Sequence, residues 1–341
     1  MTKKITKIYL LIFAPFLLFS GCAYDFSSLN QSLATTSVKT NQIEPNNVSS
    51  STSKTKKQKT TETSTITLAA VGDILIHDTV YRDAWTTSSY NFSPMFRQVR
   101  GEISSADIAF ANQESMIGGE ELGLSGYPQF NSPYGLADDL KWAEFDIVNL
   151  ANNHTLDQGE QGVKNATNYL DKIGLKYIGA ARSASSSNKI KIIEKKDIKL
   201  SFLGYTYGTN GIPVPRGKDY LVNLIDRKQI QQDIAKAKKR SDLTVVSLHF
   251  GTQYQKQPNQ IQKNLAKKLN QAGADIILGH HPHVLQPIEW IESEKNKTLV
   301  AYSLGNFLSG QIGLERNIGG ILKVEINKKD KKTTIGKVSF I

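Results

Sequence analysis

The sequence contains almost no cysteine: among its 341 residues the only one is Cys22. A single cysteine excludes an internal disulfide framework, and it excludes a structural zinc site built from thiolates. Most of the chain also lacks a strong basic excess. Residues 1–65 hold eight lysines against three acidic residues and so carry +5 of the formal net charge of +11, which leaves about +6 for the remaining 276 residues. With no basic motif interleaved with aromatic residues, this balance predicts no nucleic-acid partner.

Near its start the chain has an apolar run, Ile8–Phe19, that follows three lysines. At about twelve residues this run is too short for a comfortable transmembrane helix and is typical of a signal peptide. Two small residues and Cys22 come next, which resembles a bacterial lipoprotein signal, whose cysteine is lipidated and becomes the new N-terminus. We therefore expect residues 1–22 to be a lipoprotein signal peptide and the protein to be lipid-anchored at the extracytoplasmic face of the cell membrane. An uncleaved signal anchor is the alternative, and it would export the chain as well.

The segment 23–65 is rich in Ser, Thr and Lys and has few large apolar residues. Its stretch "SSSTSKTKKQKTTETST" cannot bury enough apolar surface to offset the entropy lost on ordering. We predict a disordered tether over this segment.

Residues 66–341 alternate between short apolar runs and amphipathic segments. This alternation predicts one α/β domain whose strands are mostly parallel, with antiparallel strands added near the end. The expected helices are Leu136–Glu144, Gln161–Ile173, Lys228–Lys239 and Gln260–Ala272. The expected strands are Ile66–Val71, Ile108–Ala111, Ile147–Leu150, Leu200–Tyr205, Leu243–Leu248, Ile276–Leu278, Leu299–Ser303, Gly320–Ile326 and Thr333–Phe340.

Several of these predicted strands are followed directly by a carboxylate, a carboxamide or an imidazole. The clearest case is "GHHPHVLQP" (279–287), which holds three of the six histidines of the chain. Taken singly, each such residue fits an ordinary turn or surface position. Because open α/β sheets bind ligands at the carboxyl ends of their strands, the joint pattern predicts one composite site. Its expected members are Asp73, Glu114, Asn153, His154, His249, His281 and His283.

Two carboxylates, one carboxamide and three imidazoles offer oxygen and nitrogen ligands that suit Mn²⁺, Fe²⁺ or Zn²⁺. Six ligating side chains are too many for one ion with open positions. They fit two ions about 4 Å apart, bridged by a carboxylate and a hydroxide, which is an arrangement that hydrolyses phosphate esters.

Six motifs in this order resemble the poly-γ-glutamate capsule biosynthesis family (CapA/PgsA type), a branch of the calcineurin-like metallophosphatases. They are "VGDILIHD", "ANQES", "NLANNHTLDQG", "LHFGTQY", "GHHPHVLQP" and "YSLGNFL", which together span roughly residues 66–310. The resemblance implies a four-layer α-β-β-α sandwich of the metallo-dependent phosphatase type. It also implies that His154 contacts the scissile phosphate as the catalytic residue.

The resemblance further implies how the ligands divide. One ion is expected at Asp73, Glu114 and His283, and the other at Glu114, Asn153, His249 and His281, with Glu114 bridging both. The first motif departs from the superfamily pattern because Leu75 stands where most of these phosphatases have a histidine. We expect His77 to lie beside the ligands or at the surface rather than among the ligands, and His280 and Asp157 to orient them.

Three functions remain open at this point. The chain could be an exported, membrane-tethered component of poly-γ-glutamate synthesis or anchoring, with a membrane-embedded polymer synthesis complex as its partner. It could be a cell-surface, metal-dependent phosphoesterase acting on a phosphate monoester or diester. It could also be a catalytically silent binding protein on the same fold. The candidate ligands are accordingly an anionic polymer and a phosphate ester.

Overall fold

The computed structural model of the chain describes residues 63–187 and 190–341. The predicted signal peptide and residues 23–62 of the predicted tether lie outside the described residues. The first strand, β1 (Thr63–Leu75), starts three residues earlier than predicted, because Thr63–Thr65 pair with Asn327–Lys329 of a later strand. No helix in the described part is long and apolar enough to cross a membrane.

The described chain builds two β-sheets. The first has seven strands in the order β13-β12-β1-β2-β3-β4, and β11 pairs with the end of β1. Strands β1 to β4 and β11 run parallel, whereas β12 and β13 are antiparallel additions at one edge. The bounds of the other strands are β2 Ile108–Gln113, β3 Ile147–Asn149, β4 Lys176–Ile178, β11 Asn306–Ser309, β12 Ile321–Lys329 and β13 Lys332–Phe340.

The second sheet has six strands in the order β5-β6-β7-β8-β10-β9. Its four central strands are parallel, and an antiparallel strand closes each edge. The bounds are β5 Lys191–Lys195, β6 Ile198–Thr206, β7 Leu243–His249, β8 Ile276–His280, β9 Ile288–Glu292 and β10 Lys297–Ala301.

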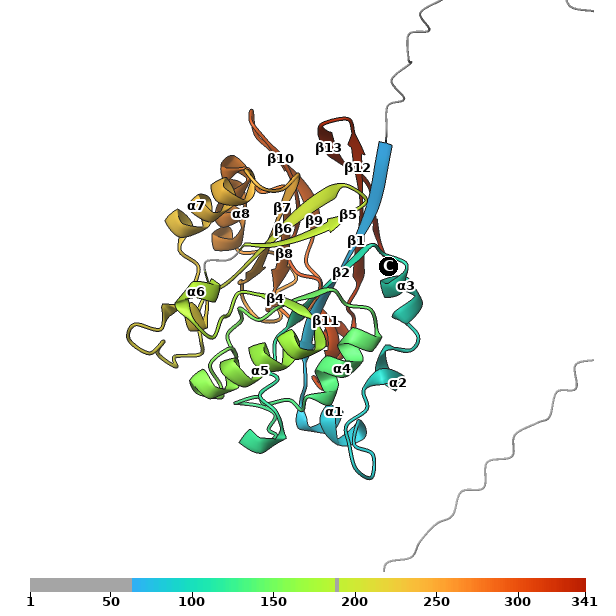
Figure 1. Cartoon of the computed structure of the whole chain (residues 1–341), viewed down its shortest axis with the longest axis vertical. Coiled ribbons are helices and arrows are strands. Elements are labelled where there is room, and N and C mark those ends of the chain that lie inside the picture. Colours follow the sequence, from blue (N-terminus) through green and yellow to red (C-terminus); the bar gives the residue numbers. More distant parts are fainter. Residues whose placement is uncertain (1–62, 188–189) are drawn as a thin grey trace, which may run out of the picture. The chain divides into compact units, whose positions relative to one another are not determined.

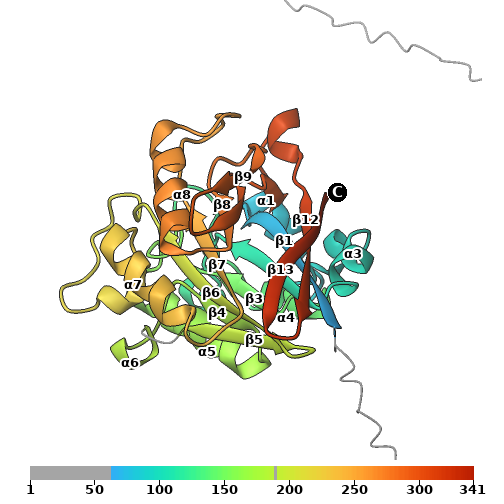
Figure 2. The same ribbon diagram turned by 90° about the horizontal axis from the view of Figure 1, so that it is seen from above.

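Three apolar cores join these sheets and the helices into four layers. The central core lies between the sheets and contains residues such as Leu68 and Phe110 of the first sheet and Phe202 and Leu278 of the second. A second core packs helices of the first half of the chain on the outer face of the first sheet, and a third packs α7 and α8 on the outer face of the second. Figures 1 and 2 show these helices on opposite sides of the paired sheets. The predicted four-layer sandwich is confirmed.

The helices are α1 Asp78–Asp83, α2 Ser93–Phe96, α3 Arg100–Ser104, α4 Gly135–Trp142, α5 Gly159–Ile173, α6 Ala184–Ser187, α7 Arg227–Ala237 and α8 Gln260–Ala272. Short 3₁₀ turns occur at Glu120–Leu122, Asp219–Leu221 and Leu314–Asn317. The four predicted helices correspond to α4, α5, α7 and α8. Helix α8 shows why such a segment is helical. At its start the Asn259 side chain accepts a hydrogen bond from the Gln262 backbone N–H, and at its end Gly273 adopts a left-handed conformation. Between them, Leu265 and Leu269 face the core.

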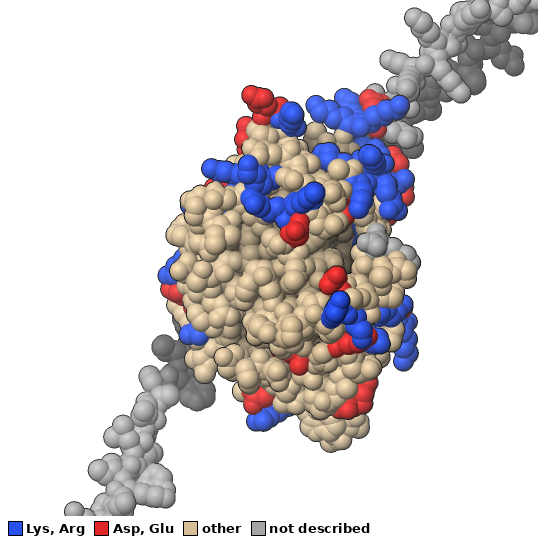
Figure 3. Space-filling view, turned by 90° about the vertical axis from the view of Figure 1, so that its left-hand side faces the viewer, with Lys and Arg blue, Asp and Glu red and all other residues tan. Residues whose placement is uncertain are grey.

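The amino ends of four parallel strands share one hydrogen-bond arrangement. An aspartate directly precedes each strand, and its Oδ2 accepts a backbone N–H from the neighbouring strand at 2.7–2.9 Å. These residues are Asp107, Asp146, Asp242 and Asp275. Lys and Arg gather at this end of the molecule, the upper end in Figure 3, where β1 begins in Figure 1. The opposite end of the strands holds the predicted site residues.

Candidate metal site

Asp73 is held in place by a very close approach of two main chains. It lies in β1, opposite Asn112 of β2 and Asn306 of β11. Its backbone N–H donates to the Gly305 carbonyl at 2.9 Å. A Cβ on the preceding Gly72 would come within 1.9 Å of that same oxygen, so only glycine lets β1 pass here. The position of the Asp73 carboxylate is therefore set by backbone, not by a flexible loop.

The Asp73 carboxylate is fully buried and accepts hydrogen bonds on both oxygens. Oδ1 accepts from Asn112 Nδ2 at 2.8 Å, and Oδ2 accepts from the His281 backbone N–H at 3.3 Å and lies 3.1 Å from His283 Nδ1. Burial alone would raise the pKa of Asp73, but the hydrogen bond to His283 and the charges of His283 and His280 hold it below its ordinary value. Asp73 is thus an anion in the folded protein.

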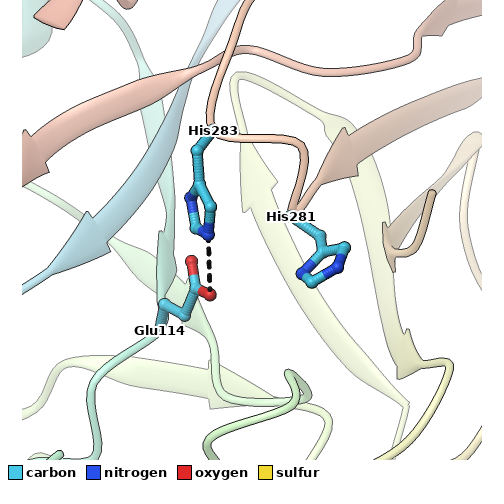
Figure 4. Close-up of side chains that lie close together, drawn as sticks. All are labelled: Glu114, His281 and His283. Atoms are coloured by element: carbon cyan, nitrogen blue, oxygen red, sulfur yellow. Dashed lines mark ion pairs between the residues drawn. The ribbon is translucent and has the colours of Figure 1, made fainter. Parts of the chain in front are cut away.

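Glu114 has a very different environment. It follows β2, is fully buried, and neither of its oxygens has a hydrogen-bond partner among the described residues. Its Oε1 lies 3.5 Å from His249 Nε2 and 3.6 Å from His283 Nε2. Figure 4 shows His283 facing the Glu114 carboxylate, with His281 beside them. Burial raises the pKa of Glu114 well above its ordinary value, although the charge of His283 opposes this.

A buried carboxylate without hydrogen-bond donors is costly unless a cation neutralises it. The donor set around Glu114 consists of imidazoles and a second carboxylate, which are ligands of divalent transition metals and zinc. The unpartnered oxygens of Glu114 therefore fit a metal site.

His281 and His283 follow β8 on a turn whose backbone is unusual. Both have positive φ, 98° and 57°, and Pro282 stands between them. Non-glycine residues adopt this region only where the surrounding structure compensates for the strain. At the start of the turn, a Cβ on Gly279 would come within 2.0 Å of the Tyr302 carbonyl oxygen. The strained backbone of this turn places both imidazoles beside Glu114.

Three buried imidazoles in and beside the site, His249, His280 and His281, are held in the neutral form that ligates metals. Burial lowers the pKa of His281 to about 3 and that of His280 to about 4, and it lowers the pKa of His249 well below the ordinary value. His283 behaves differently. Burial would lower its pKa too, but the charge of Glu114 and the hydrogen bond to Asp73 raise it to about 9. A divalent ion at Glu114 would compete with that proton.

Asn153 lies against His249. Its Oδ1 is 2.6 Å from His249 Nε2, and its Nδ2 donates to Asn210 at 3.1 Å. The other ring nitrogen of His249 is 3.3 Å from Asn112 Nδ2. The amide oxygen of Asn153 and the imidazole nitrogen of His249 thus face each other, and that nitrogen lies 3.5 Å from Glu114 Oε1.

His154 adjoins this group and opens onto a cleft. Its Nδ1 lies 2.7 Å from Asp157 Oδ2, which also accepts the Phe130 backbone N–H at 2.7 Å. The Phe130 ring stands edge-on to the imidazole, with 4.7 Å between ring centroids. These contacts fix the ring and leave Nε2 as its available nitrogen.

The structure thus brings all seven predicted site residues to one end of the two sheets. Two groups have ligand atoms within 4.8 Å of one another: Glu114 with His281 and His283, and Asp73 with Glu114 and His249. Glu114 belongs to both, as the resemblance implied. The groups differ from the expected division, which assigned His283 to Asp73 and His281 to His249. Asp73 and His283 still touch at 3.1 Å, so the division between two ions stays a prediction.

Sequence reasoning gave no role to three asparagines that touch the site. Asn112 joins Asp73 to His249 and accepts from Asn149 at 2.8 Å, and Asn306 Oδ1 lies 3.0 Å from His283 Nδ1. Asn112 and Asn306 occur in the motifs "ANQES" and "YSLGNFL". Each follows a predicted strand, and that position could have indicated a place in the site. Asn210, 3.4 Å from His154 Nδ1, follows β6 on an irregular loop and gave no such signal.

His77 and Leu75 occupy the first motif. The Leu75 side chain is buried, and His77 Nδ1 accepts the Gly310 backbone N–H at 3.2 Å. Neither belongs to the two ligand groups found among the described residues. His280 is fully buried, 3.6 Å from Asp73 Oδ1 and 5.9 Å from Phe110 between ring centroids, so it lies behind Asp73 in the central core.

The two mixed sheets packed face to face have the fold of metallophosphatase domains, and carboxylates and imidazoles gather near the carboxyl ends of both sheets. Residues 67–311 match the family model described as "Bacterial capsule synthesis protein PGA_cap". The chain belongs to this family.

Curated relatives agree with that assignment. The chain is 32% identical over 259 residues to "PGA biosynthesis protein CapA" of Bacillus subtilis (strain 168), covering 72% of this chain and 64% of the relative. It is 30% identical over 278 residues to "Capsule biosynthesis protein CapA" of Bacillus anthracis, covering 79% and 66%. The match therefore spans slightly less than two thirds of each relative's length.

A solved structure described as a novel phosphatase from Mycoplasma pneumoniae has a TM-score of 0.51 and covers 82% of this chain and 94% of its own. Its identity to this chain is 14%, so the likeness concerns the fold alone.

Proposed function

We propose that this protein is a component of poly-γ-glutamate capsule synthesis or anchoring, and that its site hydrolyses a phosphate ester. Family membership supports the capsule process. The observation that carries the chemistry is Glu114, whose two buried oxygens find no donor among the described residues and face His249 and His283.

The metal ligands in this proposal are Asp73, Glu114, Asn153, His249, His281 and His283. They would hold two divalent ions, with Mn²⁺, Fe²⁺ and Zn²⁺ as the candidates. Such ions, when bound, lower the pKa of water and offset the negative charge of a phosphoryl group. The neutral state of His249 and His281 and the anionic state of Asp73 suit this task, because ligands must be deprotonated.

His154 is the proposed catalytic residue. Asp157 holds its Nδ1, so Nε2 is the nitrogen that can donate a proton to the leaving oxygen or bind a phosphoryl oxygen. The edge-on contact with Phe130 restrains the ring in that orientation. Fixed donors of this kind stabilise the charge that develops in the transition state.

We place the protein at the extracytoplasmic face of the cell membrane, held by lipidated Cys22, with a membrane-embedded polymer synthesis complex as its partner. The support is the sequence pattern at residues 1–22. In this proposal residues 23–62 link Cys22 to the start of β1.

The test combines metal analysis with hydrolysis. The purified full chain should contain about two transition-metal ions and should hydrolyse bis(p-nitrophenyl) phosphate in the presence of Mn²⁺, and chelation should stop the reaction. Metal without hydrolysis of any phosphate ester would favour the silent binding protein. In cells lacking the protein, the wild type should restore the polymer and Cys22→Ala should not. Equal polymer with and without the protein would refute the capsule role.

A further inference from the structure

An open cleft of about 680 Å³ lies against the site. Asn153, His154 and His281 line it, so a ligand in the cleft reaches the proposed metal ligands and the proposed catalytic imidazole together. A group attached to the reacting phosphate can occupy this space.

Among the described residues that line the cleft there is no Lys or Arg, and the carboxylate of Asp157 is engaged by His154 and Phe130. The basic side chains gather instead at the other end of the strands (Figure 3). A polyanion is normally bound through several cationic groups along its length. The cleft therefore fits a ligand with one anionic group at the site and a neutral remainder.

Two tyrosines flank the site in this cleft. Tyr207 follows β6, is 49% exposed, and its ring lies 4.8 Å from that of His281. Tyr127 comes from the segment between β2 and α4, is 79% exposed, and its ring lies 6.5 Å from Phe130, which packs on His154. One tyrosine thus stands on the His281 side and the other on the His154 side. Exposed aromatic faces of this kind bind flat or ring-shaped groups by stacking.

Neutral hydrogen-bonding groups complete the lining. Gln129, Asn210, Thr252 and Gln253 all face the cleft, and Asn210 contacts both Asn153 and His154. Amides and hydroxyls next to aromatic rings recognise the hydroxyl and amide groups of a neutral ring.

We propose that this cleft selects a phosphate ester whose leaving group carries a neutral ring, a sugar or a nucleobase, held by Tyr127 and Tyr207. The inference rests on the phosphoester hydrolysis proposed above and names its substrate class. Water adds to phosphorus, the bond from phosphorus to the ring-bearing oxygen breaks, and that oxygen takes up a proton. The poly-γ-glutamate chain, with a carboxylate on every residue, is not the occupant of the cleft.

The test compares esters on the full-length protein. N-Acetylglucosamine 1-phosphate tests the sugar, adenosine 5′-monophosphate tests the nucleobase, and glycerol 1-phosphate is the ring-free reference. We expect kcat/KM for at least one ring-bearing ester to exceed that for glycerol phosphate about ten-fold or more, as stacking on an exposed aromatic allows. Tyr207→Ala and Tyr127→Ala should reduce this ratio, mainly through KM, and Tyr207→Phe should keep it.

Trp290→Ala is the control. Trp290 is also exposed, at 40%, but it packs beside Lys297 and does not line the cleft, so its removal should leave the ratio unchanged. Calorimetry gives a second readout that needs no turnover: adenosine or N-acetylglucosamine should bind the chelator-treated protein and should bind Tyr207→Ala more weakly.

The outcomes separate the two proposals. Equal hydrolysis of all three esters, blocked by chelation, would leave the phosphoesterase standing and overturn the ring-binding cleft. A γ-glutamyl oligomer that inhibits as strongly as the neutral rings would also overturn it. Hydrolysis of none of the esters, together with no ring binding by calorimetry, would refute both proposals.

Discussion

Both ends of the parallel strands carry carboxylates, and Glu114 at the carboxyl ends has surroundings opposite to those of the amino-end aspartates. At the amino ends, Asp107, Asp146, Asp242 and Asp275 each accept a backbone N–H, and lysines pair with the first three. At the carboxyl ends, Glu114 is fully buried and accepts no hydrogen bond from the described residues.

This contrast separates Glu114 from the amino-end aspartates by a physical criterion. The amino-end aspartates are satisfied by the protein itself, so they need nothing from outside to stabilise the fold. Glu114 destabilises the metal-free protein, because its burial is not offset by donors. Replacing residues at the two ends should therefore change different measured quantities.

The largest effect is expected at Glu114. Glu114→Gln removes the charge that both ligand groups share, so the purified protein should lose most of its bound metal and its hydrolytic activity should fall to background. Plasma mass spectrometry of the dialysed protein measures the metal. Asp107→Asn, the same chemical change at the other end, should keep full metal content. A Glu114→Gln protein with the wild-type amount of metal would contradict the bridging role.

Second in size is the loss of the proposed catalytic imidazole. His154→Ala should lower turnover by about 10²–10⁴-fold while metal content stays at the wild-type level, because the ring acts on the substrate rather than on the ions. Asp157→Asn should lower turnover less, since it only loosens the orientation of the ring. If His154→Ala removed the metal as well, the residue would be a ligand and its assignment would be wrong.

Third is the pH dependence of stability in the chelator-treated protein. Buried His249, His280 and His281 have lowered pKa values, so the unfolded chain takes up their protons first and stability should fall as the pH drops from about 6.5 toward 4.

Other groups shape this profile as well. The lowered pKa of His77 adds to the fall, whereas the raised pKa values of Glu114, Asp139 and Asp275 oppose it. His283, with its pKa near 9, contributes fully throughout this range and does not vary. Urea melts at pH 7 and pH 5 should therefore show a loss, and His280→Leu should flatten the profile by about 1.4 kcal/mol per pH unit. A flat wild-type profile would contradict the neutral buried imidazoles.

The smallest effect is expected at the amino ends. Asp275→Ala leaves the Thr244 backbone N–H without its acceptor at 2.8 Å, which should cost about 1–3 kcal/mol of unfolding free energy. Metal content and turnover should not change. Denaturant unfolding measures the first quantity, and any loss of metal in this variant would show that the two ends are not independent.

Much of this arrangement was predictable from the sequence. Runs buried on both faces, such as those of β1, β7 and β8, are nearly continuous in apolar residues and were found. The strands that were missed are three to five residues long or alternate with charged side chains, as in "KIIEK" of β5 and "IEWIE" of β9. An aspartate followed by Ile or Leu stands at the start of four strands, and this repeated pair could have predicted where those strands begin.

That the candidate residues lie at one end of the sheets was predictable, but their mutual geometry was not. Each candidate lies near or beyond the carboxyl end of a strand, and that much is local. Which imidazole faces which carboxylate depends on how the two sheets stack and on the positive φ of His281 and His283. The expected division of ligands between two ions therefore differed from the groups that the structure forms.

The passage of β1 beside the Leu304–Gly305 turn has a consequence for how the protein matures. Asp73 and His283 are distant in the chain, and Asp73 is fixed by Gly305, which comes later still. Closing such long loops costs chain entropy before the proposed metal ligands meet, so we expect the site to form late in folding. We therefore expect a newly emerged chain to bind metal weakly, and the proposed ions to be taken up in the compartment in which the last strands close.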